Sequence, residues 1–73
     1  MMQKKYNIEV DCANCAAAVE RRVAKIRGVE EVTISYMAQK MLVTYADGAD
    51  EQAVLAEILA AARKIEPDFM IEA

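Results

Sequence analysis

Two cysteines stand three positions apart in the segment Asp-Cys-Ala-Asn-Cys, residues 11–15. Thiolates are soft ligands for thiophilic ions, and a two-residue spacer lets both sulfurs face one ion. The sequence holds no histidine and no further cysteine, so it lacks the four ligands of a closed structural zinc site. A two-sulfur site keeps coordination positions open, which lets a partner's ligands enter before the first ligands leave. Cys12 and Cys15 therefore predict a site that binds a metal ion and passes it on.

Other readings of the cysteine pair stay open. Free cysteines are often buried as small apolar residues, and a Cys-x-x-Cys pair after a strand also occurs in thiol–disulfide exchange proteins. The chain is short for a thioredoxin-like fold and has no aromatic residue beside the motif. A thiol–disulfide redox module is thus the alternative from another class. A regulatory domain with incidental cysteines is the third.

The periodicity of apolar residues predicts the elements around this motif. Residues 6, 8 and 10 are apolar and alternate with polar neighbours, which is typical of a half-buried strand directly before the cysteines. After Cys15 the apolar spacing becomes helical, and Gly28 is expected to end that helix. Two further alternating runs, 32–36 and 41–45, predict a hairpin joined by residues 36–40. Met37, Met41 and Met70 are expected to pack or to line the sheet.

The second half of the chain repeats this alternation of strand and helix. Asp47-Gly48 marks a turn, Asp50 is a plausible N-cap, and Pro67 ends the helix that follows. Residues 69–72 form a short last strand. The order predicts an α+β, ferredoxin-like βαββαβ fold, with two helices on one face of a four-stranded antiparallel sheet. Cys15 then lies in the first helical turn, where free N–H groups favour a thiolate.

The composition excludes several function classes. The 73 residues carry 9 Lys and Arg and 12 Asp and Glu, a formal net charge of −3. This length predicts a single domain, 1–73, with no large enclosed cavity. The acidic balance argues against nucleic-acid binding. The absence of histidine removes the most common general base, so we expect a binding domain and not an enzyme.

The sequence also predicts where the domain acts. No apolar run approaches the ~20 residues that span a bilayer, and the start has no apolar region of a signal peptide. We expect no membrane insertion by this chain and a cytosolic location, at the cytosolic face of a membrane if the domain belongs to a larger transporter. A monomer is expected, with a metal-bridged dimer as the alternative.

Residues 11–15, in this position of this element order, resemble the metal-binding loop of heavy-metal-associated domains. Such domains occur as small metallochaperones and at the N-terminus of heavy-metal-transporting P-type ATPases. Copper-handling members show Gly-Met-Thr/His-Cys-x-x-Cys, whereas this chain has Glu-Val-Asp-Cys at residues 9–12. The Asp-Cys-x-x-Cys form and the ending Lys-Ile-Glu-Pro-Asp, residues 64–68, are similar to the zinc-, cadmium- and lead-exporting branch. The resemblance implies a role in metal transport and homeostasis.

The charge and the oxygen ligand of Asp11 bear on which metal ion the site prefers. Two thiolates and one carboxylate carry −3, so a divalent ion leaves −1 and Cu(I) leaves −2. A hard oxygen is a poor donor for Cu(I), whereas zinc and cadmium accept mixed sulfur and oxygen ligands. We expect Asp11 to favour Zn(II) or Cd(II), with Pb(II) also accepted. The alternatives are a Cu(I) site and a purely structural Asp11 that caps the helix.

Asp68 is a further candidate ligand, implied by the resemblance. In the family, the loop before the last strand approaches the metal loop. Matching this chain to the family's pattern places Asp68 at that point. A shift of the alignment would place Glu66 or Phe69 there instead, and a plain turn residue is the other reading of Asp68.

The expected partner is the body of a metal-transporting ATPase or another metal-binding domain. A basic cluster on the first helix is either a solvated face or a surface that steers such a partner. Its members are Arg21, Arg22, Lys25 and Arg27.

Overall fold

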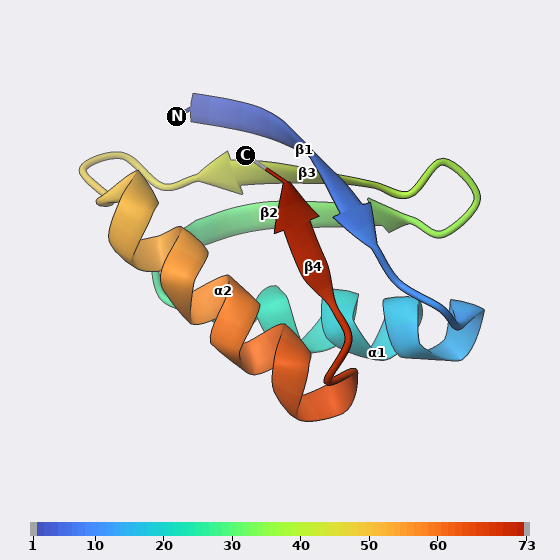
Figure 1. The fold of residues 1–73 in the computed structure, drawn as a ribbon. Helices are drawn as coiled ribbons and strands as arrows, with labels where there is room; N and C mark the ends of the chain where they lie inside the picture. The colour runs from blue at the N-terminus through green and yellow to red at the C-terminus, as the bar shows by residue number, and fades with distance from the viewer. Residues whose placement is uncertain (1, 73) are drawn as a thin grey trace.

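The computed structural model describes residues 2–72, and its elements follow the predicted order. They are β1 (Met2–Glu9), α1 (Ala13–Val23), β2 (Val29–Ser35), β3 (Lys40–Tyr45), α2 (Glu51–Ile65) and β4 (Met70–Glu72). The sheet has the order β2-β3-β1-β4 with every pairing antiparallel. Both helices cover the same face (Figure 1). The predicted α+β, ferredoxin-like arrangement is confirmed.

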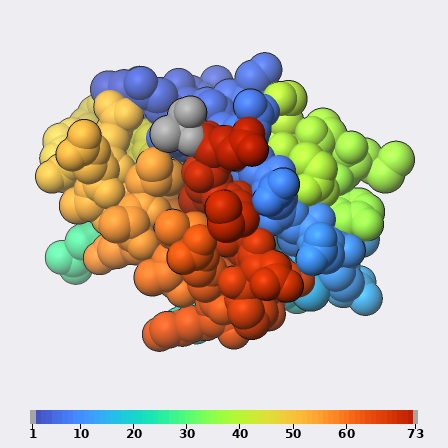
Figure 2. Space-filling model, viewed as in Figure 1, coloured from blue at the N-terminus to red at the C-terminus, as the bar shows by residue number. Residues whose placement is uncertain are grey.

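The strand before the cysteines lies inside the sheet. β1 pairs with β3 from Met2 to Asn7 and with β4 from Asn7 to Glu9. The last residues of β1 are therefore held by the short strand β4, although the ladder with β3 has already ended. This arrangement brings the segment after α2 beside the segment after β1, as the red and blue regions of Figure 2 show.

The core lies between the helices and the covered face of the sheet. The alternating strand residues and the helical stripes predicted from periodicity supply it, and Phe69 closes it just before β4. Among the described residues no buried side chain is polar or charged. The fully buried large side chains are Tyr45, Phe69, Met41, Ile58, Val19, Val23 and Val43.

Two local expectations are corrected. α1 ends at Val23, and turns continue to Gly28, whose φ of +99° forms a tight corner before β2 instead of a helix cap. A Cβ at Gly28 would lie 2.7 Å from Cγ2 of Val54, so a side chain there would collide with α2. Met37 is 90% exposed because it lies in the β2–β3 turn, where no element faces it, whereas Met41 is buried as expected and Met70 is 44% exposed.

The outer strand β2 is tied to α1 by a carboxylate. Glu20 accepts a hydrogen bond from the backbone N–H of Ile34 at 2.7 Å, and the contact is partly buried. We expect Glu20→Ala to lower the free energy of unfolding by about 1–3 kcal/mol, because the N–H loses its acceptor. Glu20→Gln retains an oxygen acceptor, so its loss should be smaller. Denaturant unfolding, with the exposed Arg21→Ala as control, tests this, and equal losses for both Glu20 variants would contradict it.

Between residues 2 and 72, neither helix is long and apolar enough to cross a membrane.

Candidate metal centre

The two cysteines lie at the start of α1. Cys12 is the N-cap residue, with φ −141° and ψ 131°, and its side chain makes no capping hydrogen bond. Its carbonyl accepts the N–H of Ala16 at 2.9 Å, which begins the helical hydrogen bonding. Cys15 follows in the first turn, as predicted. Asp11 precedes the N-cap position, so the alternative that it only caps this helix does not hold.

Both cysteines carry free thiols and are half-buried. The alternative of two cysteines buried in the core therefore does not hold. Hydrogen bonds from the backbone and thiol of Cys15 and from the backbone of Asn14 lower the pKa of Cys12. The expectation that the helix start favours a thiolate at Cys15 is wrong: its pKa is raised to about 11, by its hydrogen bond to Cys12, by burial and by the nearby charges of Cys12 and Glu66. Cys12 is therefore the more readily ionised of the two thiols, and a cation held by both sulfurs would displace the proton of Cys15.

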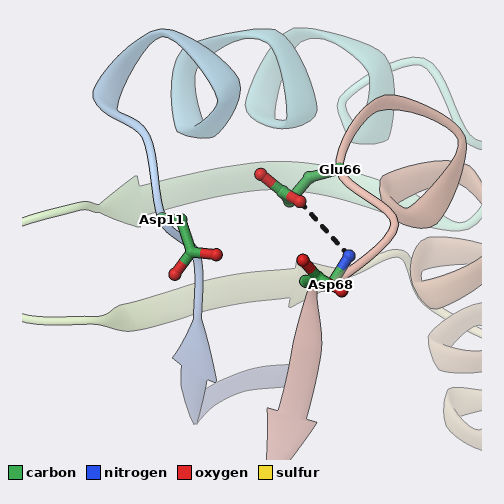
Figure 3. Close-up of side chains that lie close together, drawn as sticks. All are labelled: Asp11, Glu66 and Asp68. Atoms are coloured by element: carbon green, nitrogen blue, oxygen red, sulfur yellow. Dashed lines mark hydrogen bonds between the residues drawn. The ribbon is translucent and has the colours of Figure 1, made fainter.

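Three carboxylates gather at the end of the fold where β1 leads into the metal loop and α2 leads into β4. Asp11, Glu66 and Asp68 each place an oxygen within 4.8 Å of the other two. Figure 3 shows Asp11 on the segment after β1, with Glu66 and Asp68 on the loop between α2 and β4. Asp11 and Asp68 are exposed and Glu66 is half-buried. The structure therefore places the two candidate oxygen ligands, Asp11 and Asp68, close to each other and to Glu66.

Glu66 connects the carboxylates to the sulfurs. The charge of its carboxylate raises the pKa of both cysteines, and hydrogen bonding to Glu66 further raises the pKa of Cys15. An oxygen of Glu66 also accepts the backbone N–H of Asp68 at 3.2 Å, which orders the turn at Pro67. From the sequence, Glu66 was only an alternative to Asp68 as a ligand. The signal in the sequence was its place just after α2 and one residue before Pro67, in the loop that the resemblance brings near the metal loop.

The other alternative, Phe69, is wrong as a site residue. Its side chain is fully buried in the core. The backbone carbonyl of Phe69 accepts a hydrogen bond from Nε of Arg63 at 3.1 Å, which ties the loop to the last turn of α2. Phe69 therefore anchors the loop that presents Glu66 and Asp68, and it does not reach the metal centre.

The donor set fits a soft-to-borderline cation. The two free thiols offer sulfur ligands, and Glu66, whose charge acts on both of them, lies in a group of three carboxylates that offers oxygen ligands. Zinc and cadmium accept such mixed sets. The paired thiols differ in their readiness to ionise, so a cation bound by both would displace at least the proton of Cys15.

Comparison with known proteins gives this arrangement its context. The heavy-metal-associated domain matches residues 5–68. The cadmium, zinc and cobalt-transporting ATPase of Bacillus subtilis (strain 168) is 29% identical over 72 residues, which cover 97% of this chain and 10% of the relative. The chain thus spans about a tenth of that ATPase's length.

Solved structures agree on the fold. The CsoZ metallochaperone superposes with a TM-score of 0.73 at 16% identity, covering 99% of this chain and 97% of its own. The CopZ metallochaperone also reaches 0.73, at 19% identity, covering 97% of this chain and 100% of its own. At these identities the likeness supports the βαββαβ architecture and nothing finer.

Proposed function

The chain belongs to the heavy-metal-associated domain family, and from this premise we propose that it binds one divalent thiophilic ion, Zn(II) or Cd(II), and hands it to a partner. Cys12 and Cys15 supply two thiolates. Asp11 and Glu66 supply oxygen ligands from two different loops. Asp68 adds negative charge at the exposed edge of the site and a further oxygen. The ion is cargo, so the domain is a binding module and not an enzyme.

The observation that carries the proposal is that Glu66 belongs to the carboxylate group with Asp11 and Asp68 and that its charge also acts on both thiols. Two thiolates, Asp11 and Glu66 carry −4, so a divalent ion leaves −2 and Cu(I) leaves −3. Zinc favours four ligands, and Cu(I) prefers sulfur to carboxylate oxygen. The carboxylates therefore support binding of a divalent ion in preference to Cu(I). Pb(II) fits the same donor set.

The partner and the setting are part of this proposal. The matched ATPase moves cadmium, zinc and cobalt by its name, and the chain resembles about a tenth of it. We therefore favour residues 1–73 as a single module that acts in the cytosol. It would pass its ion to the body of such an ATPase or to another metal-binding domain. The same site would serve a free chaperone, and a monomer suffices because four donors come from one chain.

Replacing one carboxylate tests the choice of metal. Asp11→Asn keeps the size of the side chain and removes its charge, so the affinity for Zn(II) or Cd(II) should fall by roughly tenfold or more. Cu(I) affinity should change little, because two sulfurs satisfy that ion. The measurement is a competition titration of the reduced apoprotein against chelators of known affinity. Glu31→Gln on β2 is the matched control, since it removes the charge of an exposed carboxylate outside the site.

The same titration separates the alternatives. Equal losses for Zn(II), Cd(II) and Cu(I) in Asp11→Asn would remove Asp11 from the ligand set. Tight Cu(I) binding with weak Zn(II) binding would move the domain to copper trafficking. Binding of neither ion, with a reduction potential well above that of the cytosol, would support the thiol–disulfide module.

A further inference from the structure

The turn between β2 and β3 forms hydrogen bonds with the chain immediately before the metal loop. The side-chain oxygen of Gln39 accepts the N–H of Val10 at 2.9 Å, and its Nε2 donates to the carbonyl of Val10 at 3.1 Å. The same nitrogen donates to the carbonyl of Tyr36 at 2.7 Å. The backbone carbonyl of Gln39 accepts the N–H of Ile8 at 2.9 Å. One residue therefore holds three backbone groups of 8–10.

The side chain of Gln39 supplies hydrogen bonds to the chain beyond the point where the β1–β3 ladder ends. The last pair of the β1–β3 ladder is Asn7 with Lys40, three residues short of Val10. With one donor and one acceptor directed at the same residue, the Gln39 amide acts as a neighbouring strand would. Val10 is only 4% exposed, so its N–H and carbonyl need protein partners. The direction in which Asp11 leaves the sheet follows from this anchored Val10.

The backbone of Gln39 shows that the contact has a conformational cost. Its φ is +54°, and it is the one non-glycine between residues 2 and 72 with a positive φ. Glycine adopts this conformation without penalty, whereas other residues are disfavoured there. A glycine would relieve the strain but would leave the Val10 and Tyr36 groups without the amide. The side chain of Gln39 therefore compensates for its unfavourable backbone.

The two kinds of ligand are positioned by different elements. The sulfurs sit at the start of α1, which is anchored by its buried residues Ala16, Val19 and Val23. Asp11 lies before the helix, one residue after the anchored Val10. The hydroxyl of Tyr36 lies 3.5 Å from the backbone carbonyl oxygen of Asp11. Loosening Val10 should displace the Asp11 carboxylate and leave the two thiols close to their present positions.

We propose that Gln39 is a positioning residue that sets the preference for divalent ions, by fixing Val10 so that the Asp11 carboxylate faces the site. This inference rests on the proposed function. It adds that selectivity depends on a hairpin side chain that touches no ligand atom. Gln39 acts through the backbone of residues 10 and 11.

The test compares three variants in the turn. Gln39→Gly removes the amide and relieves the backbone. Gln39→Glu keeps the length and one acceptor oxygen but loses both donated hydrogen bonds. Met37→Ala is the matched control, because Met37 is 90% exposed in the same turn. The readouts are amide hydrogen exchange of the reduced apoprotein and competition titrations with Zn(II) and Cu(I).

In Gln39→Gly the exchange of the Val10 amide should rise by at least roughly tenfold, while the core amides of Met41 and Val43 stay protected. Zn(II) affinity should fall by about tenfold and Cu(I) affinity by less than about threefold. Gln39→Glu should likewise raise the exchange of the Val10 amide and lower the Zn(II) affinity. Met37→Ala should match the parent chain in exchange and in both affinities. The apoprotein exchange also shows that each variant is folded.

The outcomes separate this inference from the function beneath it. If the parent chain binds Zn(II) tightly and Gln39→Gly retains the ratio of Zn(II) to Cu(I) affinity, the positioning role is overturned and the proposed function stands. An equal fall in both affinities would likewise overturn it, since that indicates a general loss of loop structure. If the parent chain prefers Cu(I), the proposed function and this inference both fail.

Discussion

Replacing Cys12 and Cys15 together by serine is expected to reduce Zn(II) affinity by more than about a thousandfold. Apparent binding free energies of roughly 10–16 kcal/mol for four-ligand zinc sites correspond to about 2.5–4 kcal/mol per ligand, so the loss of two ligands exceeds 4 kcal/mol. The carboxylates of Asp11 and Glu66 alone would then bind a divalent ion only weakly. Isothermal titration of the reduced apoprotein measures the change.

The fold should survive this double substitution. Both thiols are half-buried and neither forms a disulfide, so serine at each position removes no covalent link and little of the core. Circular dichroism and denaturant unfolding of the apoprotein provide the control. A double variant that keeps the parent affinity would show that the carboxylates hold the ion without the sulfurs. The metal centre proposed above would then be wrong.

The second large effect is the dependence of metal affinity on pH. The pKa of Cys15 is raised to about 11, so this thiol is protonated at neutral pH and must lose its proton on binding. Each proton displaced raises the apparent affinity tenfold for each unit of pH. The pKa of Cys12 is lowered from 9.0, so its proton is also displaced only below that lowered pKa. Affinity should therefore rise about tenfold per unit towards pH 11, and more steeply at the acidic end.

Proton release measures this directly. A titration of the reduced apoprotein with Zn(II) in two buffers of different ionisation enthalpy counts the protons lost per ion bound. Glu66→Gln should lower the pKa of Cys15, because it removes a charge and the hydrogen bond that favours the thiol. Ultraviolet absorbance of the apoprotein reports that pKa without metal. A pH-independent affinity, or a Cys15 pKa unchanged in Glu66→Gln, would contradict the described contacts of this thiol.

Periodicity was sufficient for most of the fold. Residues 6, 8 and 10 alternate because the end of β1 and Val10 just after it face the core, and α2 has buried residues at helical spacing, Val54, Ile58 and Ala62. The predicted N-cap Asp50 accepts the N–H groups of Gln52 and Ala53 at 3.1 and 3.4 Å. These features are local, and local patterns are readable because each residue's environment repeats with its element.

Local periodicity did not predict the end of α1 or the exposure of Met37. Ile26 falls at helical spacing, but the chain must turn at Gly28 to begin β2 against Val54 of the other helix. That requirement comes from packing between elements distant in sequence. Met37 belongs to an apolar-looking run, and only the position of the turn shows that nothing covers it.

The sequence by itself determined the chemistry of the centre: two thiols in one loop, an adjacent aspartate, and an element order that places them at a helix start. Only the tertiary structure decided which residues from other loops lie near this motif. Glu66 reaches Cys15 across 51 positions of sequence because β4 lies beside β1, and Gln39 holds Val10 because the β2–β3 turn closes beside the end of β1. Spacing reveals ligands that share a loop, whereas ligands and supports from other loops meet only when the sheet is assembled.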